Sequence, residues 1–116
     1  SAMGNDNKVI LLEKVGEHKN LIKIRFTQDL PPSRSVAYLA AAIGKCVKYC
    51  YYNIIIDLDN ISRVNNHFIS TIVEATVKVR REKGDIKLIN LSEHVELAIS
   101  DFNAYMFLSV TSEEQV

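Results

Sequence analysis

The sequence is poor in several residue types on which particular classes of protein depend. Its 116 residues include no tryptophan, two prolines, four glycines and two cysteines. So few cysteines exclude a disulfide-stapled scaffold, and so little glycine and proline excludes a collagen-like or low-complexity chain. No apolar run approaches the roughly 20 residues that cross a bilayer, and no secretory signal pattern is present. We therefore expect a cytoplasmic protein without membrane insertion.

The chain also lacks an excess of either charge. Fourteen basic residues balance fourteen acidic ones. This balance argues against a nucleic-acid partner or an anionic membrane surface, both of which favour a basic excess. The composition is 47% apolar and 24% charged, which is ordinary for a globular protein. We expect one domain over residues 8–116, preceded by a tag scar and a disordered N-terminus at residues 1–7.

The two cysteines, Cys46 and Cys50, are four residues apart and would share one face of a helix. Metal sites normally offer paired clusters of ligands, and the sequence has no second pair. A disulfide across a single helical turn is geometrically unfavourable. We expect reduced, partly buried cysteines and no metal site.

Hydrophobic periodicity predicts an alternation of strands and helices. A hairpin comes first, and Gly84 and Asn103 stand where the second and third helices should end. Ser33 is the expected N-cap of the first helix. The expected strands are 8–14, 21–26, 51–58, 86–90 and 107–110, the expected helices 33–47, 66–83 and 92–103, and a last helix begins near Thr111.

This order predicts an α/β domain with a four- to five-stranded mixed sheet and helices mainly on one face. The nearly continuous apolar strand from Tyr51 to Leu58 should be covered on both of its faces. The expected core residues are Ile55, Leu58, Ile69, Ile72, Val73, Leu88 and Ile99.

The central segment carries a family resemblance. A buried strand, Asn53–Leu58, leads through a short polar turn into a helix that begins near Asn65 or Asn66. This arrangement resembles the centre of STAS domains, the family of bacterial anti-sigma-factor antagonists. In that family an Asp-Ser-Ser-Gly or Asp-Ser-Thr-Gly motif opens the helix, and a partner kinase phosphorylates its first hydroxyl residue. The four motif positions here are Asn65, Asn66, His67 and Phe68. The resemblance thus places Asn66 at the phosphoacceptor position, without a hydroxyl group.

The resemblance extends from Lys8 to Val116 and is strongest over 54–110. Residues 83–92 resemble the family's helix end, strand and Ser-Pro corner, with Glu93 in place of the proline. Val95, Ile99, Asn103 and Phe107 stand where the family has valine, leucine, glycine and part of a closing apolar pair. The resemblance implies a STAS-like fold.

The family's function implies a non-enzymatic module that regulates sigma-factor-dependent transcription. Its partner would be an anti-sigma factor or a GHKL-type serine kinase, and it would use no cofactor, catalytic residue or metal. The resemblance is also compatible with a homodimer. Ser70 is the alternative phosphorylation site. Phe68 would either reshape the docking face or be buried beneath it. The partner-binding surface would comprise Asn65, Asn66, His67, Ser70, Thr71 and Glu74.

Other interpretations stay open. Asn65 and Asn66 can serve only as turn and cap residues, and His67 can be an ordinary exposed helix residue. Asp57 and Asp59 suggest either metal or phosphotransfer chemistry or the capping of backbone groups at a strand end. A second functional hypothesis is a STAS subunit of a lipid-transport ATPase complex or a stressosome-like scaffold. A nucleotide binder is a weaker third, because no phosphate-cradling glycine pattern is present.

Overall fold

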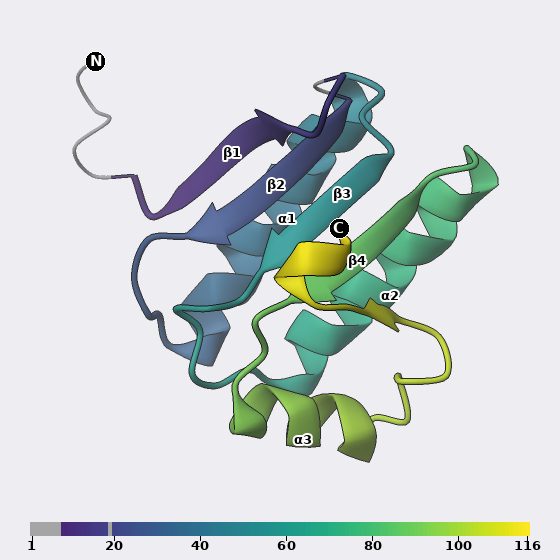
Figure 1. The fold of residues 1–116 in the computed structure, drawn as a ribbon. Helices are drawn as coiled ribbons and strands as arrows, with labels where there is room; N and C mark the ends of the chain where they lie inside the picture. The colour runs from purple at the N-terminus through teal and green to yellow at the C-terminus, as the bar shows by residue number, and fades with distance from the viewer. Residues whose placement is uncertain (1–7, 19) are drawn as a thin grey trace.

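The fold is an α/β domain built on one five-stranded sheet (Figure 1). The computed structural model describes residues 8–18 and 20–116, so the expected tag scar and disordered N-terminus at 1–7 lie outside the described residues. Within the described residues, no helix is long and apolar enough to cross a membrane. The elements are β1 (Ile10–Val15), β2 (Leu21–Phe26), α1 (Pro32–Lys48), β3 (Asn53–Asp57), α2 (Asn66–Arg81), β4 (Asp85–Ile89), α3 (Glu93–Asp101), β5 (Ser109–Val110) and a 3₁₀ turn, η2 (Glu113–Gln115).

The strands lie in the order β1-β2-β3-β4-β5. The β1–β2 hairpin is antiparallel, and every other neighbouring pair is parallel. The expected mixed sheet is therefore confirmed at five strands. Because β2, β3 and β4 run in parallel, the loops that follow them gather at one edge of the sheet.

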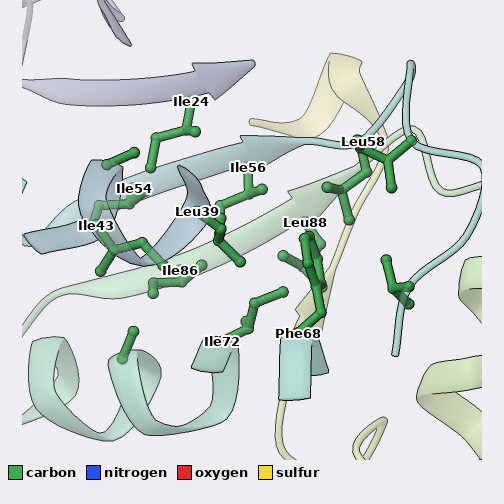
Figure 2. Close-up of a cluster of buried hydrophobic side chains, with 14 of the residues drawn as sticks. Ile24, Leu39, Ile43, Ile54, Ile56, Leu58, Phe68, Ile72, Ile86 and Leu88 are labelled. Atoms are coloured by element: carbon green, nitrogen blue, oxygen red, sulfur yellow. The ribbon is translucent and has the colours of Figure 1, made fainter. Parts of the chain in front are cut away.

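One face of the sheet packs against the helices. Figure 1 shows α1 and α2 behind the sheet and η2 in front of it. In Figure 2, Ile56 and Leu88 from the strands meet Leu39 of α1 and Ile72 and Phe68 of α2. All five are fully buried, which agrees with the apolar periodicity of both helices.

Five of the expected core residues lie in this core: Leu58, Ile69, Ile72, Leu88 and Ile99. Val73 is only half-buried and packs against the margin of the core, so its assignment to the interior is wrong. Ile55 is buried, but it lies outside the helix-side core, because alternate residues of a strand point to opposite faces. β3 is therefore covered on both faces, as its apolar sequence predicts.

The first helix does not begin at Ser33. Pro31 is its N-cap and Pro32 its first residue, and no side chain caps the first turn. Proline suits this position because its missing N–H would have no partner and its φ angle is already helical. The expected Ser33 cap is wrong, and Ser33 is an exposed residue inside the helix.

All three helices end in the same hydrogen-bonded motif, in which a left-handed residue follows the helix. After α2, the Lys83 N–H donates to the Arg80 carbonyl and the Gly84 N–H to the Val79 carbonyl, at 3.0 and 2.8 Å. The left-handed residue is therefore Lys83, with φ 65°, one position before the expected Gly84. Asn103, with φ 60°, takes this role after α3 as expected, and Cys50 takes it after α1 with φ 63°.

The reason for a glycine at position 84 is steric. A Cβ atom at this residue would lie 2.0 Å from the Tyr52 carbonyl oxygen. The same carbonyl accepts a 3.0 Å hydrogen bond from the Asp85 N–H. The glycine thus allows β4 to start directly beside the segment that leads into β3.

The C-terminal residues lie on the face of the sheet without α1 and α2. The expected last helix is a single 3₁₀ turn. Lys23 Nζ lies 3.4 Å from Glu113 Oε2 and 3.6 Å from Asp57 Oδ2, so one lysine joins the turn to β3. Ile55 and Val116 line the same small cavity beside this ion pair.

Candidate functional site

The candidate site is built around the N-terminus of α2. Asn65 is the N-cap, and its Oδ1 accepts a 2.8 Å hydrogen bond from the Phe68 N–H. Asn66 is the first helical residue and is exposed. A helix start presents free N–H groups and a partial positive charge. Asn65 therefore has the cap role that the sequence predicts, while the side chain of Asn66 faces solvent beside it.

Phe68 is fully buried. Its ring centroid lies 6.3 Å from that of Phe26, with the planes tilted by 38°. Of the two alternatives for this residue, the structure thus selects burial beneath the surface. The ring fixes the first turn of α2 against the end of β2, which positions Asn66 and His67 above it.

The remaining predicted surface residues follow along the first turns of α2. His67 and Glu74 are exposed, whereas Ser70 and Thr71 are half-buried. Both hydroxyl groups donate to the His67 carbonyl, at 3.1 Å from Ser70 and 2.8 Å from Thr71. Thr71 and Glu74 also border a groove between α1 and α2, so the predicted surface continues around the side of the helix.

The connection from β3 to α2 differs from the expected polar turn. It buries three apolar side chains at a spacing of three residues: Leu58, Ile61 and Val64. The Leu58 N–H donates to the Ile89 carbonyl at 3.0 Å, and the Ile61 N–H donates back to the Leu58 carbonyl at 3.0 Å. The connection is therefore held by the core along its length rather than projecting into solvent.

Polar contacts join this connection to its two neighbouring loops, and sequence reasoning missed all of them. Ser62 donates from both its N–H and its Oγ to the carboxylate of Asp29, at 3.1 and 2.5 Å. These bonds lower the pKa of Asp29 below its ordinary value. Asn60 Nδ2 donates to the Phe26 carbonyl at 2.8 Å, and Ser92 Oγ to the Ser62 carbonyl at 3.2 Å. The partners are about thirty residues apart, so no local pattern could indicate them.

The structure favours a backbone role for Asp57. Its carboxylate is buried and accepts from the Asp59 N–H at 3.0 Å and from Asn90 Nδ2 at 3.1 Å. Lys23 balances the negative charge of this carboxylate, with its Nζ 3.6 Å from the second oxygen, Oδ2. Across 8–18 and 20–116, no group of three or more His, Cys, Asp or Glu side chains is placed to hold a metal ion.

The cysteines are free. Cys46 is buried in α1, and burial raises the pKa of its thiol from 9.0 to about 11. Cys50 is exposed at the left-handed position after the helix. The side chain of Cys46 is thus an apolar core group near neutral pH, because its thiol stays protonated.

Comparison with known proteins identifies which proteins share this fold. No protein-family model matches the chain, and no curated protein matches it at a significant level. The Thermotoga maritima protein TM1081, a candidate anti-sigma factor antagonist, superposes with a TM-score of 0.76 at 13% identity, over 90% of this chain and 86% of its own. The anti-sigma factor antagonist SpoIIAA, in its unphosphorylated form, superposes with a TM-score of 0.72 at 18% identity, over 91% and 90% of the two chains. The chain therefore has the fold of anti-sigma-factor antagonists, which is the STAS fold that its central segment indicates.

Proposed function

We propose that this protein is a non-enzymatic interaction module that binds an anti-sigma factor or a GHKL-type serine kinase and thereby regulates sigma-factor-dependent transcription in a bacterial cytoplasm. The partner contacts a docking surface at the start of α2, which comprises Asn65, Asn66, His67, Ser70, Thr71 and Glu74. The observation that carries the proposal is the exposed Asn66 at the first helical position of a STAS fold.

The loops beside the docking surface support this role. Ser62 is bonded to both the loop after β2 and the loop after β4, and Phe68 packs beneath the first turn of α2. A surface that is already ordered before binding loses less conformational entropy when a partner docks. The loop 29–31 with Pro32 at the start of α1, and the neighbouring Ser62 and Arg63, also line a shallow cleft of about 270 Å³ with room for a partner side chain.

The missing hydroxyl group determines the expected regulation. A phosphate at a helix N-terminus adds close to two negative charges to a docking surface. Asn66 offers an amide and cannot accept phosphate as serine does, so binding through this surface should persist in the presence of ATP. If a kinase modifies the protein, Ser70 is the expected acceptor, because it lies one turn beyond Asn66.

The test is a titration of purified GHKL-type serine kinases with this protein, before and after incubation with ATP. We expect one of them to bind with equal affinity in both conditions, and peptide mapping should find Asn66 unmodified. A folded protein that binds none of the candidates would overturn the proposal. Stoichiometric phosphate at Ser33, on α1, would show that the regulatory surface lies elsewhere.

A further inference from the structure

The charges of the chain are divided unevenly along it. Residues 91–116 contain five acidic residues and no lysine or arginine. The last 26 residues therefore carry a net charge of −5, and residues 1–90 carry +5. The neutral chain thus has an acidic part, residues 91–116, and a basic part, residues 1–90. The acidic part of one copy can attract the basic part of another.

The basic part contains a groove between α1 and α2 of about 480 Å³. Ile43, Val47 and Ala75 contribute apolar surface to it, and the lysines Lys48 and Lys78 border it. Among the described residues that line this groove, Glu74 is the only acidic one. Gly44 also lines the groove, and a Cβ atom added there would meet no atom within 4 Å.

The acidic part contains a helix face of matching character. Leu97 of α3 is 63% exposed, whereas the same helix buries Val95 and Ile99 on its other face. Glu93 and Asp101 lie one turn to either side of Leu97 and are exposed. Residues four apart share a helix face, so the outer face of α3 carries a leucine between two acidic residues whose backbone positions are about 12 Å apart along the helix axis.

We propose that the outer face of α3 in one copy docks into the α1–α2 groove of a second copy. Leu97 enters the apolar groove, and Glu93 and Asp101 approach Lys48 and Lys78. Contact between two α3 faces is disfavoured because it would bring Glu93 and Asp101 against their own counterparts. The contact joins two different surfaces, so it generates a ring or an open chain of copies rather than an isologous dimer.

This proposal does not rest on the proposed function, because it involves no other protein. It is tested by sedimentation velocity of the purified chain over a range of concentrations. We expect the weight-average mass to rise with concentration at about 0.01 M salt and to fall toward the monomer at about 1 M, since the Debye length shrinks from about 30 to 3 Å. A mass that stays monomeric at every concentration in low salt would overturn the proposal.

Charge reversal gives the more specific test. Lys48→Glu with Lys78→Glu should weaken self-association about tenfold or more, and so should Glu93→Lys with Asp101→Lys. When mixed, the two double variants should associate again, since each then meets an opposite charge at both contacts. If the mixture stays monomeric while each variant keeps a native circular dichroism spectrum, the pairing is wrong. Association of either variant as strong as that of the parent chain would also contradict it.

Leu97→Ser tests the apolar half of the contact. The side chain is exposed, so the change should leave the fold intact and reduce association. Met106→Ser is the matched control, because Met106 is 97% exposed and lies outside α3. Loss of association in the methionine variant, with none in the leucine variant, would place the contact elsewhere.

Discussion

At the scale of single residues, Gly44 and Gly84 differ in the space available for a side chain. A methyl group at Gly44 would project into open space from a helix, whereas at Gly84 it would collide with the Tyr52 carbonyl. Gly44→Ala should stabilise the protein by about 0.5–1 kcal/mol, because alanine loses less conformational entropy in a helix. Gly84→Ala should destabilise it by about 1–3 kcal/mol through overpacking. Chemical denaturation of both variants measures the difference.

Each glycine variant serves as the control for the other. Equal effects of the two substitutions would show that the backbone of β4 does not approach Tyr52 as closely as described.

Both glycines can be seen in the sequence, but the reason for a glycine at position 84 cannot. It depends on a carbonyl group 32 positions earlier, and the local pattern indicates only a helix end.

The two cysteines should differ in reactivity and in their effect on stability. At pH 8, an aromatic disulfide reagent should modify the exposed Cys50 rapidly and Cys46 only as fast as the core opens. The pKa of Cys46 rises on folding from 9.0 to about 11, so folding favours the protonated thiol. This contribution is complete below pH 9 and is lost as the pH rises toward 11, where the unfolded thiol ionises first.

Cys46→Ala separates this contribution from other alkaline effects. The variant should lose less stability between pH 9 and 11 than the parent chain does. Two thiols modified at the same rate in the native protein would contradict the burial of Cys46.

At the scale of elements, the two faces of α2 can be compared through neighbouring residues. Ile72 is fully buried, whereas Val73 is half-buried at the margin of the core. Ile72→Ala should destabilise the protein by about 2–5 kcal/mol because it leaves a cavity. Val73→Ala should cost about 1 kcal/mol or less, since less apolar surface is lost. Urea denaturation would contradict the helix orientation if the Ile72 variant lost less than about 0.5 kcal/mol.

The elements themselves follow from local sequence patterns. Apolar periodicity predicts the hairpin, the three helices and the buried β3, and the polar residues Asn65 and Ser92 mark the starts of α2 and α3. Two of the errors arise where two local signals compete. Pro32 opens α1 in place of Ser33, and Lys83 takes the left-handed position that Gly84 was expected to hold.

The candidate site is predictable only in part, because its loops are held by contacts between residues that are far apart in the sequence. The helix start and its exposed asparagine follow from the sequence motif and the capping rule. The loops around them depend on bonds such as Ser62 to Asp29, which are 33 residues apart and require the fold itself. Burial of Phe68 against Phe26 likewise depends on β2 and α2 being neighbours in space.

At the scale of the whole molecule, we propose separate roles for two surfaces. The proposed docking surface lies at the start of α2, and the proposed self-association contact joins the outer face of α3 to the groove between α1 and α2. Thr71 and Glu74 belong both to the docking surface and to the residues that line the groove. A second copy in the groove should therefore compete with a partner at the docking surface, so strong self-association would lower the apparent affinity for the partner.

The central claim is that a partner docks at the N-terminus of α2. Asn66→Asp tests it most directly, because it adds a negative charge at the position that the sequence resemblance matches to the phosphorylated residue of STAS domains. The charge should leave the fold unchanged or stabilise it by about 0.3–1 kcal/mol through the helix dipole. It should weaken binding of the proposed serine kinase partner at least about tenfold, because an unpaired charge is desolvated in the interface.

The matched control is Asn20→Asp, the same chemical change at an exposed residue beside the start of β2. That end of the sheet is opposite to the one from which β3 leads into α2, because β2 and β3 are parallel. The measurement is a calorimetric titration of the partner with the parent chain and both variants, together with their unfolding free energies. Weakened binding for Asn66→Asp alone, with stability retained, is the predicted result. Equal affinity for all three proteins would contradict docking at this surface.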